Sequence, residues 1–175
     1  MRIKYFIMFQ LLLIFISGCS NSESDTEKGD FINTTFSGYI VKKEIGRVLV
    51  TNYIADSENK SEAIWVITSM ELDIGDRISV EFDGGLETSN PAQGKAKKIG
   101  VTHDEQQNEK SKKEAIVKAI NECKDMDVPV IKTIDYNITE NKWAVVLFDS
   151  KKNFEEKEIT IDLSVLHNSV SEKKR

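Results

Sequence analysis

LDIGDRISVEFDG, residues 72–84, is the segment whose pattern indicates the architecture most directly. Its Ile74-Gly75-Asp76 segment has the composition of a tight turn, because glycine adopts backbone conformations that other residues avoid. After this turn Ile78, Val80 and Phe82 alternate with polar residues, which is the period of a half-buried strand. The stretch therefore predicts a strand that starts directly from a turn and packs one face on a β core.

Similar short segments lie on both sides of it. TTFSGYIVKKE (34–44), RVLVTNYI (47–54), AIWVITS (63–69) and AKKIGVT (96–102) are rich in β-branched and aromatic residues. LETSNPAQGKA (86–96) has the composition of a loop, with Pro91 and Gly94 as breakers. Five short strands without a convincing helix predict a small OB-like barrel over residues 31–102, because closure removes exposed sheet edges. An open sandwich is the alternative.

The next segment predicts a linker and a helix. Residues 103–110 contain no apolar side chain and are typical of a linker. Ser111-Lys-Lys-Glu114 fits a capping box at the start of a helix. Ala115, Ile116, Ala119, Ile120 and Cys123 then recur on one side of that helix. This stripe predicts that Cys123 is buried.

Three strands are expected after Pro129. VIKTIDY (130–136) comes first, KWAVVLFD (142–149) is apolar on both faces and so central, and KEITIDL (157–163) alternates like an edge strand. The fold class is therefore mainly β with α+β. It consists of the five-stranded barrel and a one-helix, three-stranded antiparallel module over residues 111–166, with a disordered tail at 167–175.

The N-terminus has the pattern of an export signal. Two basic residues precede a short apolar run that is too short to span a bilayer, so residues 1–18 predict a signal peptide. Its end, Ile16-Ser17-Gly18-Cys19, resembles the lipobox of bacterial lipoproteins. That resemblance implies cleavage between Gly18 and Cys19, and acyl chains such as palmitate on Cys19. Residues 19–30 are polar and predict a flexible tether, so we expect a protein anchored on the outer face of the cell membrane.

A second resemblance concerns the barrel. The segments SGYIV, VLVTN, AIWVI, LDIGDRISVEFDG and ETSNPAQGKAKKIGV resemble the YobA-like family of small, uncharacterised Gram-positive lipoproteins, over residues 36–101. The resemblance implies the architecture of the barrel. It implies no activity and no catalytic residue.

Composition and motifs argue against several function classes. Removing residues 1–18 leaves 157 residues with 22 basic and 29 acidic side chains, a formal charge of −7 that does not favour nucleic acid. A Cys123–His167 nucleophilic pair is conceivable, but the apolar stripe around Cys123 favours a packing role. Asp73 and Asp76 flank a turn, yet neither these residues nor the acidic run before the last strand follows a calcium-loop pattern. We therefore expect no metal, no cofactor and no catalytic residue.

Aromatic residues are the remaining candidates for a site. Tyr53 and Trp65 are candidate ligand-binding residues, because barrels of this type stack rings on their strand faces. Trp65 as a simple packing residue is the stronger interpretation. The predicted function is an envelope binding or interaction module for a protein or cell-wall polymer. The alternatives are a regulator of an envelope enzyme that acts through residues 111–166, and an enzyme whose site linear spacing conceals.

Overall fold

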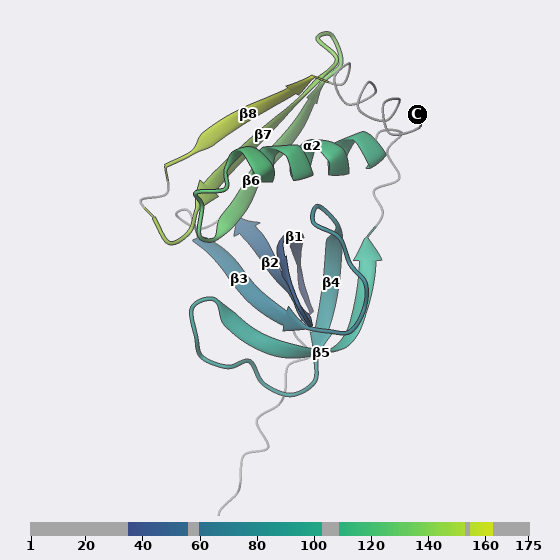
Figure 1. The fold of residues 1–175 in the computed structure, drawn as a ribbon, viewed down its shortest axis with the longest axis vertical. Helices are drawn as coiled ribbons and strands as arrows, with labels where there is room; N and C mark the ends of the chain where they lie inside the picture. Colours follow the sequence, from purple (N-terminus) through teal and green to yellow (C-terminus); the bar gives the residue numbers. More distant parts are fainter. Residues whose placement is uncertain (1–34, 56–59, 103–108, 153–154, 163–175) are drawn as a thin grey trace, which may run out of the picture. The chain divides into compact units, whose positions relative to one another are not determined.

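The computed structural model describes residues 35–55, 60–102, 109–152 and 155–162 (Figure 1). All of them belong to one compact unit, Ile32–Arg175. The predicted signal peptide, the tether and the tail lie outside the described residues.

Five strands form a closed barrel, as the sequence predicts. Their order around the barrel is β1-β2-β3-β5-β4, and β1 closes it by pairing with both β2 and β4. The β3–β5 pair is parallel and all the other pairs are antiparallel. The alternative of an open sandwich is therefore wrong. The strands are β1 (Phe36–Glu44), β2 (Arg47–Ile54), β3 (Lys60–Ile67), β4 (Arg77–Phe82) and β5 (Ala92–Thr102).

The predicted loop before the last barrel strand is partly wrong, because Gly94 lies inside β5, opposite Val66 of β3. A Cβ atom at Gly94 would lie 2.5 Å from Leu86 Cδ2 and 2.7 Å from Phe82 Cδ1. The glycine therefore leaves space for side chains that cross the strand, which is a known use of glycine within strands.

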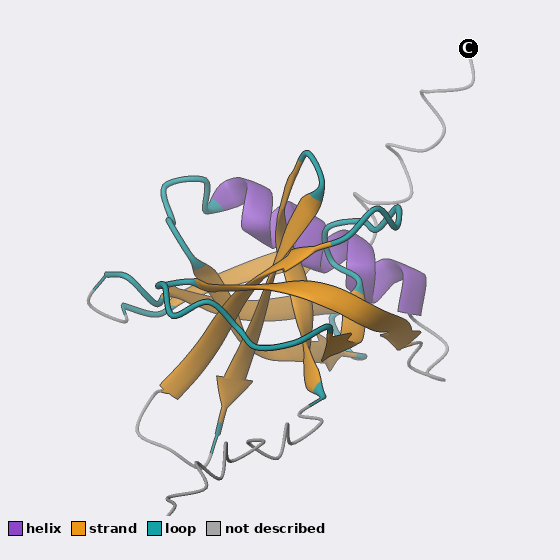
Figure 2. Cartoon of the chain, turned by 90° about the horizontal axis from the view of Figure 1, so that it is seen from below, coloured by secondary structure: helices purple, strands orange, loops and turns teal. Residues whose placement is uncertain are grey.

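The second part of the chain contains one helix and one sheet. The helix α2 (Glu109–Glu122) is followed by β6 (Pro129–Asn137), β7 (Lys142–Asp149) and β8 (Lys157–Asp162). As predicted, the three strands form an antiparallel sheet with β7 in the centre. Figure 1 shows α2 lying across this sheet, and Figure 2 shows it as the helix that runs beside the strands.

The predicted helix start at Ser111 is wrong, because α2 begins at Glu109. Ser111 therefore lies inside the first turn and does not cap it. Its hydroxyl accepts a hydrogen bond from the indole N–H of Trp143 in β7, at 3.2 Å. A buried indole N–H needs such an acceptor, so a tertiary contact uses the serine that the sequence pattern assigns to capping.

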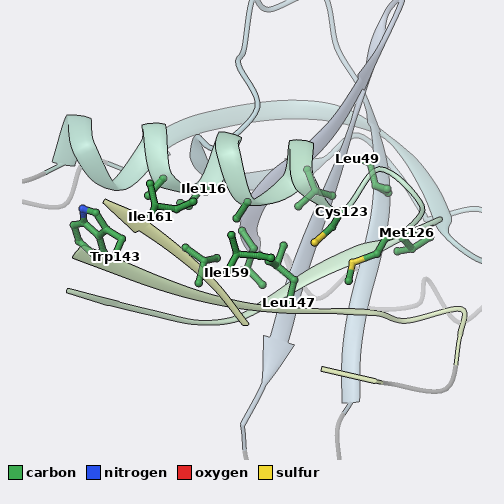
Figure 3. Packing of buried hydrophobic residues seen from close by; sticks show 14 residues of the cluster. Leu49, Ile116, Cys123, Met126, Trp143, Leu147, Ile159 and Ile161 are labelled. Atoms are coloured by element: carbon green, nitrogen blue, oxygen red, sulfur yellow. The ribbon is translucent and has the colours of Figure 1, made fainter. Parts of the chain in front are cut away.

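Two hydrophobic clusters hold the fold together. The first fills the barrel, and its fully buried members include Ile40, Val50 and Val66. The second contains residues of the barrel wall and of the helix and sheet together: Val41 and Leu49 join α2, β6, β7 and β8 in it (Figure 3). Thus β2 is buried on both faces, Val48 and Val50 toward the barrel interior and Leu49 toward the second cluster.

Hydrogen bonds reinforce the contact between barrel and module. The Thr51 hydroxyl is buried and donates to the Pro129 carbonyl at 3.1 Å, and the Lys42 ammonium donates to the Met126 carbonyl at 3.1 Å. Buried polar groups are rarely left unpaired, so these bonds fix where the chain leaves the helix and enters β6.

Close backbone packing in β1 yields a stability prediction. A Cβ atom at Gly38 would lie 2.3 Å from the Thr51 carbonyl oxygen. We expect Gly38→Ala to lower the free energy of unfolding by about 1–3 kcal/mol or more, because β1 and β2 must separate to accept the methyl group. Urea unfolding measures this. Gly85→Ala is the matched control, since no atom lies within 4 Å of its added Cβ, and an equal loss in both variants would contradict the prediction.

Candidate functional site: a basic cleft beside Tyr39

A cleft of about 260 Å³ opens where the first half of α2 meets β1, β4 and β5. The ends of β4 and β5 that border it are brought together by the pair Arg77↔Thr102. The residues on which its chemistry depends are Tyr39, Asp76, Arg77, Lys110, Lys112 and Lys113.

The ring of Tyr39 lies close to two cations in this cleft. Tyr39 and Arg77 are direct partners in the β1–β4 ladder, so their side chains share one face of the barrel. The Arg77 guanidinium carbon lies 5.6 Å from the ring centroid, and the Lys112 ammonium lies 5.9 Å from it. Both distances are within the range of a cation–π interaction.

Lys113 joins the helix to the turn that precedes β4. Its ammonium lies 2.5 Å from Asp76 Oδ1 and 3.4 Å from Asp73 Oδ2. Partial burial lowers the pKa of Lys113, but the hydrogen bonds and charges of Asp76 and Asp73 outweigh it and raise the pKa above its ordinary value. The turn approaches the helix closely at Gly75, whose φ is +90° and whose added Cβ would lie 3.2 Å from Lys113 atoms.

The cleft is basic on an acidic protein. Four of its lining residues are cationic and one, Asp76, is anionic, while the whole chain carries a formal charge of −5. Asp76 is engaged by Lys113, so its charge is compensated within the wall. Within the described residues, no carboxylate forms an ion pair with Arg77. The cleft therefore presents cationic side chains next to an aromatic face.

The structure places Tyr53 and Trp65 outside this cleft. Both lie on the barrel wall that faces the second module. Trp65 pairs with Leu49 of β2, and Tyr53 lies four positions further along β2, so the two residues are roughly 13 Å apart at about 3.3 Å per residue. The ring of Tyr53 meets Phe148 edge to face at 6.0 Å. Trp65 packs against the shared cluster. Their ligand-binding role stays a prediction.

The exposed side of Trp65 is covered by a side chain. The Arg47 guanidinium lies 4.3 Å from its ring centroid. The same guanidinium donates to Glu44 Oε2 and, at 2.8 Å, to Gln93 Oε1. A ligand ring at Trp65 would have to displace this bonded arginine.

Cys123 is buried, as predicted, and is 2% exposed. Burial raises the pKa of its thiol, and the nearby Lys157 ammonium offsets this only in part. The thiol is therefore a poor nucleophile at neutral pH, since the thiolate is the reactive form. His167, its conceivable partner, lies outside the described residues, as do Gly18 and Cys19.

Three of the acidic residues considered for calcium pair with lysines. Asp73 and Asp76 pair with Lys113, and Glu156 pairs with Lys132. No group of three or more potential metal ligands lies together in the part of the chain that the structure describes.

Asp149 is a buried carboxylate that the sequence analysis did not single out. Its oxygens accept backbone hydrogen bonds from Asp127 at 2.6 Å and from Val128 and Lys151 at 3.0 Å, and Lys152 lies 3.5 Å away. Burial alone would raise the pKa of Asp149, but these bonds outweigh it and hold the pKa below its ordinary value. Its role is structural, because it ties the helix–strand connection to the end of β7. The Asp-Ser-Lys-Lys turn at 149–152 is the signal that could have found it.

The sequence patterns also did not predict the cleft residues as a site. Tyr39 and Arg77 are far apart in sequence, and only the β1–β4 pairing that closes the barrel makes them neighbours. Lys112 comes from the helix beyond the barrel. No local motif connects the three.

Comparison with known proteins relates only the barrel to a family. Residues 37–103 match a family model described as a protein of unknown function (DUF3221). No curated protein and no solved structure matches the chain. The match includes Tyr39 and Arg77 but ends before Lys112, so the cleft combines a wall from the matched segment with a wall from outside it. The finer resemblance to YobA-like lipoproteins stays a prediction.

Asp149 predicts an acid-dependent stability. The folded-state pKa is lowered, so this carboxylate stabilises the fold above the unfolded value of about 3.9 and loses that contribution as the pH falls through the folded-state pKa. We expect Asp149→Asn to reduce the free energy of unfolding at neutral pH by about 1–3 kcal/mol. The reduction should shrink in acid. Chemical unfolding of both proteins across pH measures it, with Asp83→Asn as a control, because the Asp83 side chain is 61% exposed. A loss independent of pH would contradict the assigned charge.

Proposed function

We propose that the protein is a lipid-anchored, extracytoplasmic envelope protein whose folded part binds a ligand and does not transform it. The observation that carries the binding part is the basic cleft beside Tyr39. The lipobox-like Ile16-Ser17-Gly18-Cys19 carries the anchoring part. Within the described residues no helix has the length and apolar character to cross a membrane.

The state of the reactive side chains favours binding over catalysis. Cys123 is buried with a raised thiol pKa, and Asp149 is buried with both oxygens engaged by backbone donors. A catalytic carboxylate or nucleophile needs access to a substrate. The accessible chemistry of the cleft is cationic and aromatic, and such groups recognise a negative charge without breaking bonds.

The cleft also argues for a binding site over an apolar docking groove on the second module. A second hollow, of about 760 Å³, lies along α2, and its lining residues are mostly charged: Lys110, Lys113, Glu114, Val117, Lys118, Asn121 and Glu122. Charged side chains along one side of a helix are typical of a solvated face. A regulator that docks an enzyme through residues 111–166 therefore has less support than a ligand-binding role.

The anchor has a direct test. We expect Cys19→Ala to abolish metabolic fatty-acid labelling and to release the protein from the membrane fraction, because acyl chains on this thiol would provide the anchor. Cys123→Ala is the matched control, since Cys123 is the other cysteine of the chain and is buried. Labelling that persists in Cys19→Ala, or that disappears in Cys123→Ala, would overturn the assignment.

The binding role is tested in intact cells with a photo-crosslinking amino acid. We place it at position 110, whose lysine lines the cleft and has an 86% exposed side chain, and for comparison at position 98, whose lysine is 75% exposed on the barrel. A species captured at 110 and absent at 98 is the expected result. Identical capture at both positions, or none at either, would contradict a binding role for the cleft.

A further inference from the structure

We propose that one end of the barrel rests in the surface of the lipid bilayer, with the β1–β2 turn at Ile45 inserted among the lipids. It rests on the anchor proposed at Cys19 and adds which part of the folded chain faces the bilayer. Two observations carry it: exposed apolar side chains gather at this end of the barrel, and the chain enters β1 at the same end.

Large apolar side chains are unevenly distributed over the surface that the structure describes. Five of them are exposed within the described residues, and four of the five belong to segments that meet at one end of the barrel: Ile45 (105% exposed), Ile67 (39%), Met70 (47%) and Leu86 (41%). Single exposed apolar residues are ordinary, but a gathering of them marks a surface that contacts a partner or a membrane.

The β1–β2 turn and the end of β3 bring three of these residues together. Ile45 follows β1 in a two-residue turn that leads to Arg47. Arg47 is the ladder partner of Ile67 in β3, and the Thr68 amide donates a hydrogen bond of 3.0 Å to the carbonyl of the turn glycine. The Met70 amide donates in turn to the Thr68 hydroxyl at 3.0 Å. The tip of the turn therefore lies beside the end of β3 and the residues that follow it.

Leu86 and the start of β5 complete this end of the barrel. Lys95 of β5 is the partner of Ile67 in the β3–β5 ladder. The preceding residue, Gly94, lies against Leu86, whose Cδ2 would be 2.5 Å from an added Cβ atom. Figure 1 shows the arrowhead of β3 next to the first half of β5. Leu86 therefore borders the same end as Ile67.

The chain also enters the barrel at this end. Phe36, the first residue of β1, is the partner of Val80 in β4. Phe82 lies two residues further along β4, about 7 Å away at strand spacing. Phe82 and Leu86 approach Gly94 together, since an added Cβ atom there would lie 2.7 Å from Phe82 Cδ1. The start of β1 and the exposed apolar residues thus share one end of the barrel.

The proposed anchor holds this end close to the bilayer. Cys19 and residue 35 are 16 residues apart, so the chain between them spans at most about 55 Å. A protein tied to a surface meets that surface at a high effective concentration, so even weak contacts with it stay occupied. A lipid surface is therefore favoured over a soluble partner as the material that covers the apolar end.

Charge does not attract this end to a bilayer. The charged residues within two positions of the four apolar ones have both signs: Lys43 and Arg47 are basic, and Glu44, Glu71 and Glu87 are acidic. Glu44 pairs with Arg47 at 2.6 Å, and Lys95, the partner of Ile67, lies 3.8 Å from Asp83. Apolar contact must supply the attraction, so insertion should depend little on salt and should not require anionic lipid.

The test reads the surroundings of Ile45 in the full, acylated chain. Ile45→Cys carries the environment-sensitive fluorophore NBD, and the protein is moved from a non-ionic detergent into phosphatidylcholine vesicles. Ile138→Cys with the same fluorophore is the matched control, because Ile138 is also an exposed isoleucine (82%) between two paired strands, β6 and β7. Cys123 is buried, so the fluorophore is directed to the introduced cysteine.

We expect the emission at position 45 to shift to shorter wavelength in vesicles and to be quenched by lipids brominated near the top of their acyl chains. Position 138 should keep the emission of a fluorophore in water. The shift at position 45 should persist at high salt and in vesicles with or without phosphatidylglycerol, because apolar contact drives the insertion.

A second variant tests the same end without a label on the turn. Ile45→Asp, combined with NBD at Met70→Cys, should abolish the shift at position 70, because a carboxylate keeps the turn out of the lipid. Ile138→Asp in the same labelled protein is the control and should leave the shift unchanged. Since both isoleucines are exposed, neither substitution removes a core contact, and circular dichroism confirms that each variant is folded.

Emission typical of water at position 45, or an equal shift at positions 45 and 138, would overturn the proposal. A shift at position 45 that brominated lipid leaves unquenched would also overturn it, because a protein surface would then cover this end. Fatty-acid labelling that persists in Cys19→Ala overturns the anchor, and crosslinking at position 110 reports on the cleft. Failure of this insertion is therefore distinguishable from failure of the proposed function.

Discussion

Burial of the outer wall of the barrel joins the two parts of the fold. Val41 and Leu49 face away from the barrel interior and yet are at most 1% exposed, because the helix and the second sheet cover them (Figure 3). Removing an aliphatic side chain from water contributes about 1.5–3 kcal/mol. The barrel therefore presents on β1 and β2 an apolar surface that requires the second part of the chain, and the two parts share one core.

This shared core also shapes the surface of the barrel. The wall of β1, β2 and β3 that carries Trp65 and Tyr53 packs against the second part of the chain, and the candidate cleft lies at the border between barrel and helix. There the outward-facing Tyr39 lies beside cationic side chains of β4 and α2. The candidate cleft and the packing of the two parts thus arise from the same contact. The wall supplied by the helix lies beyond the segment that matches the family model.

The polar contacts at this junction connect the barrel, the helix and the sheet. Asp76 forms an ion pair with Lys113, and the Thr51 hydroxyl donates a hydrogen bond to the Pro129 carbonyl. Asp149 accepts hydrogen bonds from the backbone amides before β6. Each contact satisfies a polar group at a place where the chain passes between parts of the fold. The Asp76–Lys113 pair holds the first half of α2 against the turn at Gly75, and so fixes the walls of the cleft.

The class of fold could be predicted from the sequence, because each strand has its own local pattern. Alternation in 77–82, the doubly apolar run at 142–149 and the stripe through Ile116 and Ala119 predicted a barrel strand, a central strand and a buried helix face, and all three are present. It also predicted burial of Cys123. Two predictions were wrong: the start of the helix at Ser111 and the placement of Gly94 in a loop. The Ser111 hydroxyl accepts a hydrogen bond from an indole N–H, and Gly94 lies in a strand where side chains cross over it.

The candidate site, in contrast, follows from long-range packing. Tyr39, Arg77 and Lys112 become neighbours through barrel closure and helix packing. Periodicity reports which face of an element is buried, and it carries no information on which distant elements meet. Contacts between separate elements explain the burial of Leu49, the position of Arg47 over Trp65 and the pairing of Asp76 with Lys113. Local pattern therefore gave the elements, and long-range packing gave the cleft.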